Sequence, residues 1–182
     1  SAYDAFVHET YTQVPDETRQ ALSDILSELV GEEDADPYQY IPRVLEYVST
    51  SARYDLNTPA VPDGEDFVSW FLHDSETGYC VHYATAATIL LRCLGVPARY
   101  VTGYYTDVYE NEWTTVTSDD AHAWVEIYLN GIGWLRDDPT PAADTPAQTA
   151  PEEPIAAPIE PADNQPKDTP PAGDEPPAVP DI

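Results

Sequence analysis

A cysteine, Cys80, lies at the expected start of a helix. It follows Gly78 and Tyr79, and a run of small and apolar residues continues from it to Leu94. Unpaired backbone N–H groups and the helix dipole favour an anion at such an N-terminus, and this environment lowers the pKa of a thiol. Cys80 is therefore the candidate nucleophile.

The second cysteine, Cys93, is predicted to be an inert thiol buried among Leu and Ala side chains. It lies 13 positions after Cys80, which is about 20 Å along a continuous helix that rises ~1.5 Å per residue. The Cα atoms of a disulfide lie within ~7 Å of one another. We therefore expect no disulfide bond between the two cysteines.

A proton acceptor for the thiol is available at His122. It stands in the stretch DDAHAWVEIYL, residues 119–129, which alternates as a strand does. Asp138 follows in GWLRDDPT, residues 133–140, at the end of the next predicted strand, where it could orient the imidazole and stabilise its cation. Taken alone, His122 could be a structural histidine and Asp138 only an Asp before a Pro.

The spacing of His122 and Asp138 constrains the hairpin that joins them. Residues opposite one another in an antiparallel hairpin have numbers with a constant sum, and they share a face. A plain Asn-Gly turn at 130–131 gives the odd sum 261, which puts the two side chains on opposite faces. We therefore predict a sum of 260 or 262, with a three-residue connection or a bulge at Gly131 or Gly133, and a His122 nitrogen within about 3.2 Å of an Asp138 oxygen.

The elements that must position these residues form a helical first half and a β-rich second half. Apolar spacing and capping residues predict helices over 16–30, 37–48, 65–72 and 80–94, with Asp36 as a cap. Alternating Tyr, Val, Thr and Trp predict strands over 99–106, 113–117, 121–129 and 132–137. Helices followed by adjacent strands indicate an α+β domain, in which the Cys-bearing helix packs on an antiparallel sheet.

The charge of the chain excludes two classes of partner. Its 182 residues include 34 acidic and 7 basic side chains, a net charge of -27, which repels phosphate backbones and anionic lipid headgroups. We expect no nucleic acid and no membrane contact by this segment. General solubility is a simpler explanation of the acidity than a specific cationic partner. The negative charge would also attract cationic substrates, but at physiological salt screening limits this attraction to about 8 Å.

The end of the sequence, residues 141–182, is predicted to be an acidic, proline-rich linker. Twelve of the 19 prolines fall after residue 140, and the last aromatic residue is Trp134. We expect an extended, disordered spacer, with a docking ligand as the alternative.

The domain is then 1–140, with a helical part over about 1–50 and a catalytic core over about 54–140. A chain without Met or leader is expected to be an excised segment of a longer protein.

Three motifs in this order resemble the core of the transglutaminase-like superfamily. They are the two stretches above and GYCVHYATAATILLRCLGVPARYVTGY, residues 78–104. The resemblance covers about residues 36–140 and implies a papain-like core with Cys80 as nucleophile, His122 as general base and acid, and Asp138 as orienting carboxylate. Asp137 fits less well, because in this family the acid directly precedes Pro-Thr. The sequence most resembles a bacterial membrane-anchored branch, which implies an extracytoplasmic domain at the cell surface.

The resemblance also implies a reaction. It is a thiol-dependent acyl transfer at a carboxamide or peptide bond of a protein or peptide, including cell-wall or cell-surface material, with no cofactor and with hydrolysis slightly favoured over transamidation. The oxyanion is expected to bind the Cys80 N–H and one upstream side chain. Tyr54 is preferred for that second donor, and Asn57 and Trp70 are the alternatives.

Two other classes of function compete with this interpretation. A zinc site could use Cys80, His82 and His122, but thiolate and imidazole sites usually repeat a short paired spacing, and only one Cys-x-His occurs here. We prefer His82 as a helix-face residue next to the site. The stronger alternative is a catalytically silent binding or scaffolding domain of a cell-surface protein, since a fold does not guarantee activity.

Overall fold

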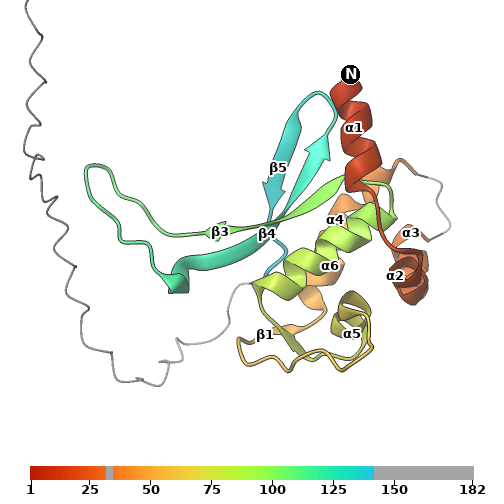
Figure 1. Cartoon of the computed structure of the whole chain (residues 1–182), viewed down its shortest axis with the longest axis horizontal. Coiled ribbons are helices and arrows are strands. Elements are labelled where there is room, and N and C mark those ends of the chain that lie inside the picture. Colours follow the sequence, from red (N-terminus) through yellow and green to blue (C-terminus); the bar gives the residue numbers. More distant parts are fainter. Residues whose placement is uncertain (32–34, 142–182) are drawn as a thin grey trace, which may run out of the picture. The chain divides into compact units, whose positions relative to one another are not determined.

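The computed structural model describes residues 1–31 and 35–141, which belong to one compact unit spanning Ser1–Asp144 (Figure 1). Its elements are α1 (Ala2–Tyr11), α2 (Asp16–Ala21), α3 (Ser23–Val30), η1 (Pro37–Tyr40), α4 (Ile41–Thr50), β1 (Arg53–Tyr54), α5 (Phe67–His73), β2 (Thr77–Gly78), α6 (Cys80–Cys93), β3 (Ala98–Tyr104), η2 (Ser118–Asp120), β4 (Ala121–Leu129) and β5 (Gly133–Asp137). Residues 142–182 of the expected linker lie outside the described residues, and the domain boundaries stay predictions.

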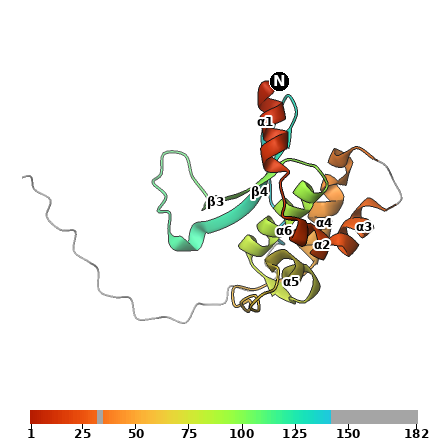
Figure 2. The ribbon, with the colours of Figure 1, turned by 45° about the vertical axis from the view of Figure 1, so that its right-hand side comes forward.

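Helix α6 is the centre of the unit. Figures 1 and 2 show the sheet on one side of it and α4 on the other, and α5 also packs against it. Most of its small and apolar residues are buried, and Ala86, Ala87, Leu90 and Leu91 are fully so. A helix that is apolar around most of its circumference can be covered on every side, and the prediction of a buried central helix is confirmed.

The other helices differ from prediction in three places. Helix α1 was not predicted, because only Val7 of its residues is buried; aromatic contacts hold it to the β4–β5 hairpin, such as Tyr11 on Trp134 at 4.9 Å. The segment over 16–30 is two helices that meet at Leu22. The segment after Asp36 begins as the 3₁₀ turn η1, which Asp36 caps by accepting the N–H of Tyr38 at 3.0 Å.

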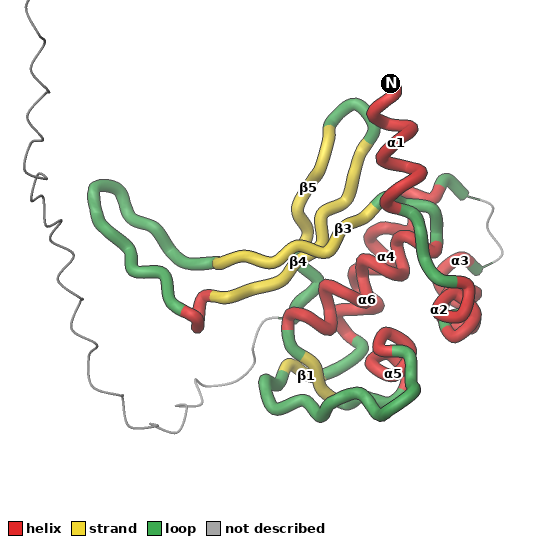
Figure 3. Tube along the Cα trace, in the orientation of Figure 1, coloured by secondary structure: helices red, strands yellow, loops and turns green. Residues whose placement is uncertain are grey.

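Two sheets organise the remainder of the unit. The strands β3, β4 and β5 form an antiparallel sheet in that order, and the short strands β1 and β2 pair in parallel. The predicted strand over 113–117 is wrong, since residues 105–117 form a long loop between β3 and β4 (Figure 3). Its residues have strand-forming types, but Trp113 is fully exposed and no partner strand lies beside it among the described residues.

The β4–β5 hairpin has the register that the His122 and Asp138 spacing requires. Val125 lies opposite Asp137 and Leu129 opposite Gly133, a constant sum of 262. Three residues, 130–132, connect the strands, and φ is 77° at Gly131 and 112° at Gly133, in the region that favours glycine. The predicted even sum is confirmed.

Candidate active site

The thiol of Cys80 occupies the first residue of α6, as predicted. The residue is 8% exposed and packs with Ala84 of its own helix and Ala123 of β4. Tyr79 precedes the helix in an extended conformation. The thiol therefore lies at the helix N-terminus, between the helical half and the sheet, where an anion is favoured.

The backbone leading to Cys80 is fixed by a pairing between distant segments. Strand β1 lies beside β2, and the N–H of Asp55 donates to the carbonyl of Gly78 at 2.8 Å. Gly78 also lies against α5, where a Cβ would come within 2.5 Å of Phe71 Cε2. The close approach of these segments explains why the residue at 78 has no side chain.

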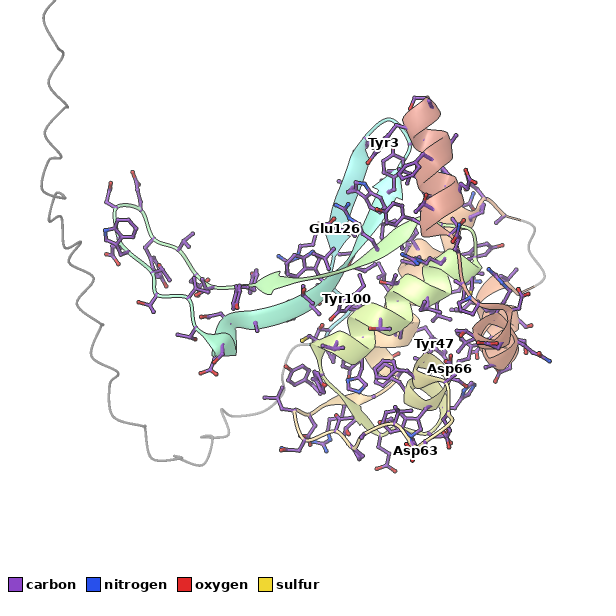
Figure 4. The ribbon with its side chains drawn as sticks, viewed as in Figure 1. Tyr3, Tyr47, Asp63, Asp66, Tyr100 and Glu126 are labelled. Atoms are coloured by element: carbon purple, nitrogen blue, oxygen red, sulfur yellow. The ribbon has the colours of Figure 1, made fainter. Side chains whose placement is uncertain are left out.

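The pKa values of two tyrosines, Tyr54 and Tyr100, respond to the charge of Cys80. Burial raises the pKa of Tyr54 on β1, and the negative charges of Cys80 and Asp138 raise it further. Burial also raises the pKa of Tyr100 on β3, with Cys80 and Tyr79 contributing, and Figure 4 shows Tyr100 between β3 and α6. Both phenols stay protonated at neutral pH and can donate hydrogen bonds.

The two alternatives to Tyr54 are engaged elsewhere. The side-chain amide of Asn57 donates to Asp55 Oδ1 at 3.3 Å. Trp70 is 8% exposed, and its ring lies 6.3 Å from that of His82. Tyr54 is partly buried, and its phenol is the group among the three whose pKa can respond to the charge of Cys80, since Asn and Trp side chains do not titrate.

His122 and Asp138 meet as the register predicts. Nε2 of His122 lies 2.6 Å from Oδ2 of Asp138, and the N–H of Thr140 donates to Oδ1 at 3.1 Å. Burial tends to raise the pKa of Asp138, but the hydrogen bonds from His122 and Thr140 and the charge of His122 outweigh it, so the pKa is lowered. Asp138 is therefore held as a carboxylate that can stabilise an imidazolium.

The second imidazole nitrogen, Nδ1 of His122, makes no hydrogen bond within the described residues, and none joins the imidazole to the Cys80 thiol there. Strand β4 carries both His122 and Ala123, and Ala123 packs against Cys80. Successive side chains of a strand point to opposite faces, so this contact does not itself join the imidazole to the thiol. Hydrogen bonds between a nucleophile and its base are often long in unliganded enzymes and tighten when substrate binds.

An arginine stack behind Asp138 was not predicted. Nη2 of Arg136 lies 3.4 Å from Oδ2 of Asp138, and its guanidinium lies 4.9 Å from the Tyr105 ring and 4.8 Å from the Trp124 ring. Trp124 in turn stacks on His122, with ring centroids 6.4 Å apart. The even-numbered face of the hairpin is the signal that could have found Arg136 and Trp124, since His122 and Asp138 share it.

His82 lies on α6 two residues after Cys80, and Cys93 is the last residue of that helix. His82 is 4% exposed among aromatic rings, its Nδ1 accepts the N–H of Tyr79 at 3.3 Å, and burial lowers its pKa. Cys93 is only half-buried, because α6 ends at that residue, although burial still raises the pKa of its thiol.

The residues named for the alternative zinc site are not gathered. Within residues 1–31 and 35–141, no group of three or more His, Cys, Asp or Glu side chains is placed to hold a metal ion.

No helix in this part of the chain is long and apolar enough to cross a bilayer. The arrangement thus offers a thiol at a helix start, an imidazole fixed by a carboxylate and two phenol donors.

Comparisons with known proteins show the family of the chain. Residues 24–139 match the family described as the transglutaminase-like superfamily. The uncharacterized protein YebA of Bacillus subtilis is 31% identical over 148 residues, which are 77% of this chain and 20% of YebA. Protein-glutamine gamma-glutamyltransferase of Pseudomonas aeruginosa is 44% identical over 89 residues, which are 48% of this chain and 13% of that protein.

A solved structure has a similar fold. It is the periplasmic domain of TgpA from Pseudomonas aeruginosa, bound to ethylmercury, with a TM-score of 0.59 and 33% identity over 74% of this chain and 49% of that chain. The predicted fold class, an α+β papain-like and transglutaminase-like core, is confirmed. The alignments take in a fifth or less of the length of the two curated relatives.

Proposed function

The chain belongs to the transglutaminase-like superfamily, and from this premise we propose that it is a cysteine acyltransferase or hydrolase that works through a thioester on Cys80. The observation that carries the proposal is the 2.6 Å contact between His122 Nε2 and Asp138 Oδ2, in a domain whose Cys80 thiol lies at the start of α6. This pairing leaves Nδ1 of His122 available to the thiol.

In the proposed reaction, His122 takes the proton of Cys80, and the sulfur forms a bond to a carboxamide or peptide carbonyl carbon. The carbon–nitrogen bond then breaks, and His122 delivers the proton to the leaving amine. Water or a second amine attacks the thioester carbon and gives a proton to His122. The carbon–sulfur bond breaks, and the thiol is restored.

The surrounding groups have supporting roles in this proposal. Asp138 orients the imidazole and stabilises its cation. The Cys80 N–H and the Tyr54 hydroxyl bind the oxyanion, in keeping with the effect of Cys80 on the Tyr54 pKa. We favour hydrolysis slightly over transamidation, because transamidation requires a site for the second amine as well.

We also propose that the domain works outside the cytoplasmic membrane on protein or peptide substrates. The similarity to a periplasmic domain supports this location, and the name of the Pseudomonas relative, a protein-glutamine gamma-glutamyltransferase, supports a glutaminyl acyl donor. A membrane-anchored parent protein stays a prediction from the resemblance.

Alkylation followed by turnover tests the enzyme proposal. The protein is treated with iodoacetamide at pH 7.5, and the modified cysteine is identified by mass spectrometry in the wild type, in Cys80→Ala and in Cys93→Ala. We expect Cys80 to react at least tenfold faster than Cys93, and ammonia release from a glutamine-containing peptide to be lost only in Cys80→Ala. Faster labelling of Cys93, or equal turnover by both variants, would overturn the role of Cys80, and the absence of turnover in the wild type would favour a silent binding domain.

A further inference from the structure

The loop between β3 and β4, residues 105–117, carries large apolar side chains in solvent, and we call it the aromatic loop. Tyr105, Val108, Tyr109, Trp113 and Val116 are each more than half exposed, and Trp113 is fully exposed. Figure 4 shows side chains along this loop extending away from the rest of the described ribbon. Exposure of so many apolar groups on one segment does not stabilise the fold and is typical of a binding surface.

The aromatic loop is also acidic. Asp107, Glu110 and Glu112 alternate with its aromatic residues, and no Lys or Arg occurs between Arg99 and Arg136. Within the described residues these three carboxylates form no salt bridge. Their charge is therefore available to a partner, and it selects a cationic one.

The base of the aromatic loop adjoins the active-site residues. The Tyr105 ring lies 6.2 Å from the His122 ring and 4.9 Å from the guanidinium of Arg136. The N–H of Tyr105 donates to the carbonyl of Asp120 at 2.8 Å, which ties the start of the loop to the residue before β4. A polypeptide bound along the loop would therefore extend toward His122 and Asp138.

We propose that the aromatic loop is the docking surface for a basic, extended segment of a polypeptide substrate. Lys and Arg side chains of that segment pair with Asp107, Glu110 and Glu112, and their stems and cationic heads pack on the tyrosine and tryptophan rings. The inference rests on the proposed function for the direction of binding, because it places the bound chain beside Cys80. Negative charge on the loop disfavours both an anionic bilayer and a second copy of a chain with net charge -27.

Binding is tested in the Cys80→Ala protein with a fluorescein-labelled 12-residue peptide of alternating Lys and Ser, followed by anisotropy at 50 and 300 mM salt. Two loop variants are compared: Tyr109→Ala with Trp113→Ala, and Asp107→Asn with Glu110→Gln and Glu112→Gln. We expect each to weaken binding at least fivefold, and higher salt to weaken binding to the parent. The substituted side chains are exposed, so the circular dichroism spectra of both loop variants should match the spectrum of the parent.

Matched controls change the same chemistry elsewhere. Phe6→Ala removes an exposed aromatic from α1, and Asp63→Asn with Glu65→Gln and Glu76→Gln removes three exposed acids outside the loop. Both should bind within twofold of the parent, and a peptide with Glu in place of Lys should not bind. Unchanged binding by the loop variants would overturn the proposal. So would loop-dependent binding to phosphatidylglycerol vesicles in place of the peptide, or loop-dependent dimerisation in sedimentation.

The test separates this inference from the proposed enzyme. Peptide binding is measured without the Cys80 thiol, so it does not depend on turnover. Conversely, iodoacetamide labelling of Cys80 in the two loop variants should match the wild type, because the probe is too small to use the loop. If Cys80 is not labelled but the peptide binds, only the enzyme proposal is contradicted. If Cys80 is labelled normally but the peptide does not bind, only the docking surface is contradicted.

Discussion

Oδ2 of Asp138 lies 2.6 Å from Nε2 of His122 although 16 positions separate the two residues. We predict that Asp138→Asn lowers kcat by about 10²- to 10⁴-fold, because a neutral amide accepts a hydrogen bond but does not stabilise the imidazolium. Asp137→Asn is the matched control, since Asp137 is exposed and, within residues 1–31 and 35–141, its side chain accepts one hydrogen bond, from the backbone N–H of Asp138. Equal losses in the two variants would contradict the role of Asp138.

The same carboxylate should make stability depend on acid pH. Its pKa in the folded protein is lowered, so its contribution is fully present above the unfolded pKa of about 3.9 and is lost as pH falls through the folded pKa. Asp138→Asn should therefore flatten the acid side of a plot of Tm against pH. An equal flattening in Asp137→Asn would contradict the assignment to Asp138.

The hairpin connection can be shortened without separating His122 from Asp138. Deleting Ile132, which is 70% exposed, leaves an Asn-Gly turn between Leu129 and Gly133, the pair that already closes the hairpin. We expect activity within about threefold of the wild type, as measured by kcat/KM, because tight Asn-Gly turns suit hairpins.

Deleting Leu135 from the strand should have the opposite result. Every residue after it then moves by one position, and Asp138 changes face. We expect kcat/KM to fall by about 100-fold or more, because His122 is left without its carboxylate. Leu135→Ala controls for the side chain alone, which is 45% exposed. Activity in the strand deletion equal to that in the loop deletion would contradict the register argument.

Gly78 should tolerate no side chain. A Cβ there lies 2.5 Å from Phe71 Cε2, and Phe71 is fully buried. We predict that Gly78→Ala lowers the free energy of unfolding by about 1–3 kcal/mol, the usual cost of overpacking. Urea unfolding measures it, and a double-mutant cycle with Phe71→Leu should recover part of the loss. Additive effects in that cycle would exclude this contact as the cause.

Buried Tyr83 should limit stability at alkaline pH. Burial raises its pKa to about 12, with the charge of Tyr54 contributing, and its hydroxyl donates to the carbonyl of Ala52 at 2.8 Å. Its contribution is therefore fully present below the unfolded pKa of about 10 and is lost as pH rises toward 12. Tyr83→Phe should cost about 0.5–1.5 kcal/mol at pH 7.

The Tyr83→Phe protein should also lose less stability than the wild type between pH 9 and pH 11.5. Urea unfolding at both values measures the difference. Tyr109→Phe in the exposed aromatic loop should leave the free energy of unfolding unchanged at both pH values. An alkaline loss that is the same in Tyr83→Phe and in the wild type would assign the effect to other groups.

Features with a local or periodic signal could be predicted from sequence alone. The start of α6 at Cys80 follows from the residues around it, β4 and β5 follow from alternation, and the even register follows from parity once His122 and Asp138 are required to share a face. These depend on helix and strand geometry, in which a residue's own neighbours decide its conformation.

The remaining features depended on contacts between distant segments. Strand-forming residues in the aromatic loop found no partner strand, α1 is held by aromatic contacts to a hairpin more than 100 residues away, and aromatic rings from α5 enclose His82. The pairing of Tyr54 with Gly78, two residues before Cys80, likewise requires β1 to lie beside β2. The sequence determined which residues could form the site and on which face of the hairpin they lie. Only tertiary packing decided which side chains surround them, because burial and pairing partners come from segments that no local pattern connects.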